Sequence, residues 1–349
     1  MQDWVTQFTI GVFMGTFVYL CLCFLVTHQD EHTRFVPQVS LITSWVLVVG
    51  SFGFLVFYSH RVASSIQNPD LVARIVDDLV PEILKSQGPR PEDVSGVVPA
   101  EEVVERQIAE GAPVTWPVSG YVQEIHHAAI VSAAERANAV VHVLRRPGQF
   151  VLRGEPLASI WPASRARELE ASIDRHVEVG RHRTLSQDVE FGIAQIVEIA
   201  LRALSPAVND TFTGVACVDW VGDALLATAE APRSDGCWFD ATHELRLRVR
   251  PLRVDRLARM AFDQIRQAAS DNPAVLIRVL DMLRRIAPRM HEHEKKALLV
   301  EAEAVREAAA SKVLAKLDRE DVEAAWLRAL PALTGGKDGQ KGQTEPVDG

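Results

Sequence analysis

Cysteine is scarce in this sequence, and the common motifs of metal and nucleotide chemistry are absent. Four cysteines occur among 349 residues, and none forms a CxxC pair. Because Cys21 and Cys23 lie within an apolar run, neither a disulfide framework nor a zinc site is expected. HExxH, a glycine-rich phosphate loop and a serine nucleophile elbow are also missing. We therefore predict no metal, no cofactor and no catalytic residue. These absences do not exclude enzymatic activity, but they argue against it.

Positive charge is also in short supply. The chain carries 37 Lys and Arg against 46 Asp and Glu, a net charge of -9. Nucleic-acid-binding domains favour a basic surface. The charge balance therefore argues against nucleic acid as the main partner.

Charge is missing altogether from two long stretches near the N-terminus. Residues 4–27 and 39–58 contain no charged side chain, and each is long enough to cross about 30 Å of hydrocarbon. The segment between them, 27–38, is rich in charged residues. A cleaved signal peptide is the alternative for the first stretch, but a basic leading region and a small-residue cleavage pattern are lacking. We predict two transmembrane helices, and thus a lipid bilayer as partner.

Small residues suggest how these two helices pack. Gly11 and Gly15 form a GxxxG pair, and Gly50 and Gly53 lie in the second stretch. Such residues let two membrane helices approach closely, so we expect contact along them. Neither stretch carries the ionisable residue that coupled transporters usually need. A channel would require several copies of the chain.

Basic residues determine the expected orientation by a narrow margin. His60, Arg61 and Arg74 follow the second stretch, whereas the hairpin has Arg34 against two acids. The positive-inside rule then places the large remaining body in the cytoplasm.

The fold class expected from these patterns is a membrane-anchored α+β protein. It would contain two transmembrane helices, a small half-barrel-like β-rich module and a mainly α-helical soluble body. The predicted parts are the transmembrane hairpin at 1–62, a stalk helix and Pro/Gly linker at 63–113, the β-rich module at 114–162, the helical domain at 163–332 and a disordered tail at 333–349.

The sequence of the β-rich module, VLRRPGQFVLRGEPLASI at residues 143–160, is similar to the half-barrels of biotinyl and lipoyl carrier domains. Those carriers need an exposed lysine, and residues 114–162 contain none. We therefore expect the module to serve packing or subunit contact. His126 and His127 would point to opposite faces of a strand, so a shared metal ion is not expected.

Polar residues interrupt a regular helical pattern between residues 186 and 226. Ser205-Pro206 ends one helix, and Asn209-Asp210 offers a cap for the next. The structural interpretation is a tight elbow whose polar residues serve as turn and caps. The alternative is a polar pocket for a small molecule of unknown identity, with the second helix aimed at an anion. Its candidate ligand-binding residues are Glu190, Arg202, Ser205, Asn209, Asp210, Thr213 and Asp219.

Histidine and cysteine are missing from the elbow, so it holds no nucleophile with a base. Cys217 lies one turn beyond on an apolar helix, where a buried inert thiol is expected.

The stretch FGIAQIVEIALRALSPAVNDTFTG, residues 191–214, resembles the signature of bacterial predicted membrane proteins grouped as domain of unknown function 2254. Thr211 and Gly214 depart from it, where the family usually has Pro and Ala. Further blocks extend the resemblance over roughly residues 10–290. It implies residence in the bacterial inner membrane, and it implies no known activity, cofactor or site. Members usually carry two further membrane helices upstream, which suggests a shortened or mis-started N-terminus.

These observations favour an integral membrane protein that acts without catalysis as an oligomeric scaffold, sensor or channel-like protein. The alternative is a membrane-bound ligand-binding protein or enzyme that uses the elbow. In that case Asp210 and Glu190 would act as acid and base, and Arg202 would bind an anion.

Overall fold

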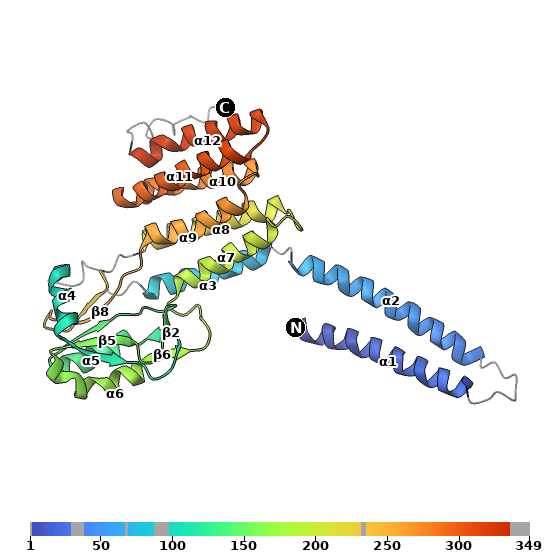
Figure 1. The fold of residues 1–349 in the computed structure, drawn as a ribbon, viewed down its shortest axis with the longest axis horizontal. Coiled ribbons are helices and arrows are strands. Elements are labelled where there is room, and N and C mark those ends of the chain that lie inside the picture. Colours follow the sequence, from blue (N-terminus) through green and yellow to red (C-terminus); the bar gives the residue numbers. More distant parts are fainter. Residues whose placement is uncertain (1, 29–37, 67–68, 87–97, 232–234, 336–349) are drawn as a thin grey trace, which may run out of the picture. The chain divides into compact units, whose positions relative to one another are not determined.

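The computed structural model describes residues 2–28, 38–66, 69–86, 98–231 and 235–335 (Figure 1). Most of the connecting segment 27–38, the first part of the Pro/Gly linker and most of the tail lie outside these residues. The chain divides into two compact units, Met1–Asn68 and Pro69–Gly349. We call the first the hairpin unit and the second the body.

The hairpin unit consists of two long helices, α1 (Gln2–His28) and α2 (Gln38–Ile66), which contact each other. Windows Gln7–Leu25 and Gln38–Tyr58 are long and apolar enough to cross a membrane, yet only 11% and 6% of their residues are buried. Phe17 and Trp45 are among the large apolar side chains exposed to the surroundings. A surface of this kind suits lipid rather than water.

The contact between α1 and α2 differs from the predicted one. Thr16 and Ser51 are buried, and their hydroxyl oxygens lie 2.8 Å apart. Phe8 and Phe54 pack with their ring centroids 5.4 Å apart. At the four glycines, a Cβ atom would meet nothing within 4 Å in the described part of the chain. The hydroxyl and aromatic contacts hold this pair together, and the glycines face elsewhere.

A third helix also meets the length and hydropathy of a span. It is α8 (Thr211–Glu230), half of whose window is buried inside the body. It packs against α3, α7, α9 and α10 of the helical core. That core contains α3 (Pro69–Ser86), α7 (Val189–Ala203), α8, α9 (Val254–Ala268), α10 (Pro273–Ile286), α11 (Glu292–Lys312) and α12 (Lys316–Thr334).

Helix α3 belongs to this core and is not the free stalk that we expected. Val72, Val76, Leu79 and Ile83 recur at helical spacing and are fully buried against α7 and α8. Gly192 permits the approach, because a Cβ there would lie 2.6 Å from the Leu79 side chain. An apolar stripe of this width gains more free energy when it is buried in a core than when it is exposed along a stalk.

The second core of the body is a β module. One sheet has the order β1-β5-β3-β8-β7 and the other β4-β2-β6 within the described residues. The strands are β1 (Ala112–Thr115), β2 (Gly120–Ile125), β3 (Val140–Val143), β4 (Phe150–Val151), β5 (Pro156–Trp161), β6 (Val177–Gly180), β7 (Cys237–Phe239) and β8 (Leu245–Val249). The helices that accompany them are α4 (Glu101–Glu110), α5 (His127–Ala137) and α6 (Ala166–His176).

The module is larger than the continuous segment that we predicted. β6 follows α6, and the hairpin β7–β8 returns to the sheet after α8. β8 lies parallel to β3, with Val141 opposite Leu247, and both side chains are fully buried. A parallel partner so distant in the sequence gives no local signal, so the sequence does not indicate that β8 belongs to this sheet.

Candidate functional site

The elbow between α7 and α8 has the turn and caps that the sequence predicts. Oδ1 of Asp210 accepts a hydrogen bond from the Thr213 backbone N–H at 3.0 Å, and Oδ2 accepts one from the Thr213 hydroxyl at 2.7 Å. These donors hold the pKa of Asp210 below its ordinary value. Asn209 lies in the left-handed region with φ 48°, which Asn tolerates well. The Ser205 hydroxyl donates to the Arg202 carbonyl at 2.8 Å.

Three of the seven candidate residues lie apart from this turn or point away from it. Glu190 is in the first turn of α7, about 18 Å along the helix axis from Arg202. Arg202 itself is exposed and pairs with Glu198. Asp219 accepts a hydrogen bond from Nη2 of Arg278 at 2.7 Å. The structure therefore brings Ser205, Asn209, Asp210 and Thr213 together, and it does not place all seven residues around one pocket.

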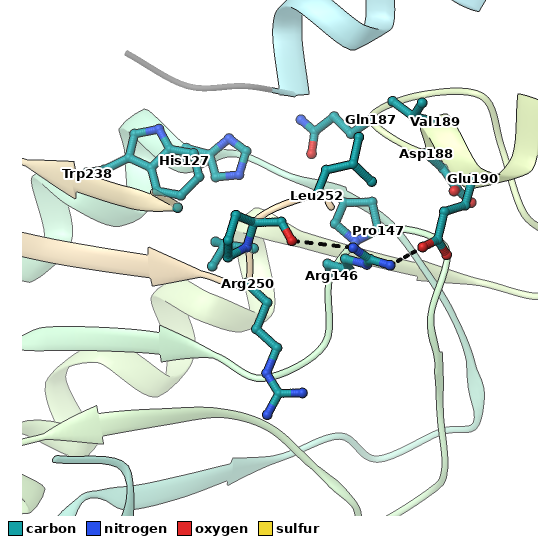
Figure 2. A pocket seen from close by; sticks show the side chains of 13 residues that line it. His127, Arg146, Pro147, Gln187, Asp188, Val189, Glu190, Trp238, Arg250 and Leu252 are labelled. Atoms are coloured by element: carbon teal, nitrogen blue, oxygen red, sulfur yellow. Dashed lines mark hydrogen bonds and ion pairs between the residues drawn. The ribbon is translucent and has the colours of Figure 1, made fainter. Parts of the chain in front are cut away.

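A cavity of the body lies instead at the other end of α7, beside the β module (Figure 2). Its free volume is about 50 Å³. The lining residues come from segments far apart in the sequence, and they are His127, Arg146, Pro147, Gln187, Asp188, Val189, Glu190, Gly236, Trp238, Val249, Arg250, Pro251 and Leu252. We call this cavity the Arg146 cleft.

Arg146, between β3 and β4, is the central cation of the cleft. Its largely buried guanidinium forms an ion pair with the largely buried carboxylate of Glu190, and Nη1 lies 3.5 Å from the Pro251 carbonyl oxygen (Figure 2). Arg256 approaches the same Glu190 oxygen with its Nε at 3.2 Å. Burial lowers the pKa of Arg146, and the Glu190 carboxylate opposes that effect. One buried carboxylate is thus shared between two arginines.

A second ion pair fixes the start of α7 at the cleft. Asp188 is buried, and both of its oxygens accept hydrogen bonds from Arg183, at 2.8 and 2.9 Å. Its Oδ1 also caps α7 by accepting from the Phe191 backbone N–H at 3.0 Å. Gly148 makes room for this carboxylate: its φ is +85°, and a Cβ there would lie 2.2 Å from Oδ2. Only glycine fits that turn without strain.

An aromatic pair forms the opposite wall of the cleft. The rings of His127 and Trp238 stack with centroids 4.3 Å apart and planes 8° apart, at a distance from Arg146 in Figure 2. Burial, and next the neighbouring His126, lower the pKa of His127 to about 4. The imidazole is therefore neutral near pH 7, and this wall carries no charge.

Of the cleft residues, only Glu190 was among the predicted ligand-binding residues, and it was assigned to the elbow. His127 was considered only as a metal ligand, which was not expected. The local signal for Arg146 is the turn Arg145-Arg146-Pro147-Gly148 after an apolar strand. Trp238 gives no comparable signal, because its hairpin reaches the cleft only through the long-range sheet.

Metal-binding groups and the buried cysteine Cys217 were the subject of two further expectations. Among the described residues, no group of three or more His, Cys, Asp or Glu side chains could hold a metal ion. Cys217 is fully buried in the helical core, and burial raises the pKa of its thiol to about 12. The prediction of a buried core cysteine at this position is confirmed.

Comparison with known proteins connects these features to a family. The family described as Predicted membrane protein (DUF2254) matches residues 1–285. The chain belongs to this family. The match includes the hairpin unit, the elbow and the whole Arg146 cleft. An uncharacterized protein of Mycobacterium tuberculosis is 29% identical over 306 residues, which cover 82% of this chain and 56% of that relative.

An uncharacterized protein of Mycobacterium bovis has the same identity and coverage. The chain thus spans about half the length of the curated relatives that it matches. No solved structure matches it. Membership establishes a predicted membrane protein and indicates no specific activity.

Proposed function

We propose that this chain is a non-catalytic, membrane-anchored sensor or scaffold of the bacterial inner membrane, with the body in the cytoplasm. The observation that carries the proposal is the contrast between the two units. The apolar windows of α1 and α2 are almost entirely exposed, whereas the body buries its apolar side chains in two cores of its own. A helix pair of this kind anchors a protein in a bilayer, and the body is free to bind or to scaffold.

We assign the spans to α1 and α2 and leave α8 in the body. Half of the α8 window is buried by neighbouring helices, and its Asp219 pairs with Arg278 of α10. Lipid would have to replace those contacts and desolvate the acid, which is costly. In the same way, we keep the half-barrel-like interpretation of the β module as a proposal that its two sheets and short strands support.

Labelling at Ser311, which is exposed on α11, tests the anchoring and the orientation. A Ser311→Cys protein should resist carbonate extraction from membranes. A membrane-impermeant maleimide should modify it in inverted vesicles and leave it unmodified in intact spheroplasts. The wild-type protein, labelled in parallel, is the control for the native cysteines. Labelling of Ser311→Cys in spheroplasts would show that the body lies outside the cytoplasm. Release of the protein by carbonate would show that the hairpin unit does not anchor it in the membrane.

An oligomeric assembly is the further part of this proposal. Phe212 at the elbow is 89% exposed, and Leu314 after α11 is 93% exposed. Large apolar side chains of this kind favour a protein contact. Native mass spectrometry of the detergent-purified protein measures the subunit number. A monomer at all concentrations would exclude the oligomer. If Phe212 forms part of the subunit contact, Phe212→Ser should lower the number of subunits.

The alternative function is ligand binding or catalysis at the elbow. The proximity of Ser205, Asn209, Asp210 and Thr213 favours it, although each has a turn or cap contact. Asp210→Asn retains an oxygen that can cap the helix, so the fold should persist. If the elbow is a site, this variant loses function while its unfolding midpoint stays unchanged. A stable and fully functional variant would exclude the alternative.

A further inference from the structure

We propose that the Arg146 cleft binds a small monocarboxylate, which competes with the carboxylate of Glu190 for the Arg146 guanidinium. This proposal goes beyond membrane anchoring and does not depend on it.

The first reason is that the cleft already contains a carboxylate-binding arrangement. Arg146 and Arg256 both approach the carboxylate of Glu190. In the described part of the chain, the Arg146 guanidinium hydrogen-bonds only Glu190 and the Pro251 carbonyl. A guanidinium has five N–H donors in a planar fork that matches a carboxylate. The same donors can therefore bind an incoming carboxylate in place of Glu190.

The second reason is the local charge. The lining residues Arg146 and Arg250 and the neighbouring Arg183 and Arg256 stand against Asp188 and Glu190, so basic residues outnumber acidic ones by two at the cleft of a chain whose net charge is -9. An anion is therefore attracted to this site, although the chain as a whole is acidic. Arg256 is 60% exposed, so its side chain can move together with Glu190 when the incoming carboxylate displaces that residue.

The third reason is the apolar surface facing this ion pair. Val189, Val249 and Leu252 line the cleft together with the stacked His127–Trp238 wall. This surface suits a short hydrocarbon chain. A phosphate ion needs hydrogen-bond donors around all of its oxygens, so apolar carbons on one side disfavour it.

The size of the cavity limits the ligand. Its free volume of about 50 Å³ corresponds to about four groups of the size of a water molecule, at about 10–15 Å³ each. A ligand whose carboxylate takes the place of the Glu190 head and whose chain has two to four carbons fills this space. Butyrate represents the class.

The competition with Glu190 gives the proposal a distinctive signature. Glu190→Gln keeps the size of the side chain but removes its charge, so it weakens the competitor without emptying the cleft. A hydrogen bond to a charged group changes an affinity by about tenfold or more. Binding of an added carboxylate should therefore become tighter by at least about tenfold. A purely structural ion pair predicts no such gain.

The experiment is isothermal titration calorimetry of the full chain in detergent with sodium butyrate, sodium acetate and inorganic phosphate. Trp238 fluorescence provides a second signal from the cleft wall. We expect butyrate to bind more tightly than acetate and phosphate. Glu190→Gln should bind butyrate at least about tenfold more tightly, and Arg146→Met should lose at least about tenfold. Glu198→Gln is the matched control, because Glu198 lies on the same helix and pairs with an exposed arginine; it should bind as the wild type does.

Circular dichroism establishes whether each variant is folded. If Arg146→Met does not fold, Arg256→Gln replaces it, since this exposed side chain contacts the same Glu190 oxygen and its loss should weaken butyrate binding. The proposal is overturned if folded Glu190→Gln shows no saturable binding of butyrate up to about 10 mM, well above a millimolar Kd. It is also overturned if phosphate binds more tightly than butyrate, or if Glu198→Gln gives the same gain as Glu190→Gln.

Discussion

The titration of one buried acid should lower the stability of the body as the pH rises from about 4.5 to about 7. The buried His127 and His142, whose pKa is lowered to about 4, act in the opposite direction over this range, so the effect of the acid is isolated by comparison with a variant that cannot ionise there. Glu301 on α11 is only 3% exposed and accepts a hydrogen bond from Nε of Arg266 at 3.1 Å. Nη2 of the same arginine donates to Asp263 at 2.8 Å. One arginine thus serves two carboxylates. Burial, and next the repulsion from Asp263, raise the pKa of Glu301 from 4.5 to about 7.

The sign and size of the effect follow from linkage. Between pH 4.5 and 7 the folded state keeps a proton on Glu301 that the unfolded state has released, so the contribution of Glu301 favours unfolding more at each step in pH. The stabilisation is fully present below pH 4.5 and is lost once the pH passes 7. A shift of this size corresponds to about 3 kcal/mol of the free energy of unfolding.

Urea unfolding followed by circular dichroism between pH 4.5 and 8 measures this loss. Glu301→Gln cannot ionise, so it should lack the component of about 3 kcal/mol and be more stable than the wild type at pH 8. Glu303→Gln, an exposed neighbour on α11, should retain the wild-type pH dependence. A free-energy difference between Glu301→Gln and the wild type that does not grow from pH 4.5 to 8 would refute the reasoning.

Three further substitutions test packing, capping and the turn at the cleft. Leu79→Ala should lower the free energy of urea unfolding by about 2–5 kcal/mol because it leaves a cavity in the helical core, whereas the half-exposed Leu71 tolerates Ala; equal effects would contradict the place of α3 in the core. Asp210→Ala should cost about 0.5–2 kcal/mol through loss of the α8 cap, measured by thermal unfolding, and an unchanged midpoint would contradict the capping role. Gly148→Ala should lower the free energy of unfolding by about 1–3 kcal/mol because of its left-handed φ and the nearby Asp188 carboxylate. Gly154 is exposed and has a left-handed φ without the close contact, so Gly154→Ala in the same unfolding assay separates the two causes.

Features with local causes could be predicted from the sequence. The elbow depends on Pro206, Asn209 and Asp210, which act within a few residues of their own position, and the caps are found where they were expected. The apolar stretches of α1 and α2 are equally local, since length and missing charge define them.

Features with distant causes could not be predicted in this way. The helix α3 was predicted as a stalk helix, but its partner across Gly192 is more than a hundred residues away, so no local signal indicates that it belongs to the core. The pair Arg146–Glu190 depends on the β3–β4 turn meeting the first turn of α7. Glu190 was therefore assigned to the wrong end of its helix, although the residue itself was selected.

The pairing of β3 with β8 has a consequence for biosynthesis. Val141 leaves the ribosome about a hundred residues before its neighbour Leu247, so one edge of β3 stays unpaired while the chain in between is translated. At about 5–20 residues per second this interval lasts for about 5–20 s. An open strand edge is a template for association with other chains. The nascent protein must therefore shield this edge during elongation, and a chain that stops before β8 should be recovered in aggregates.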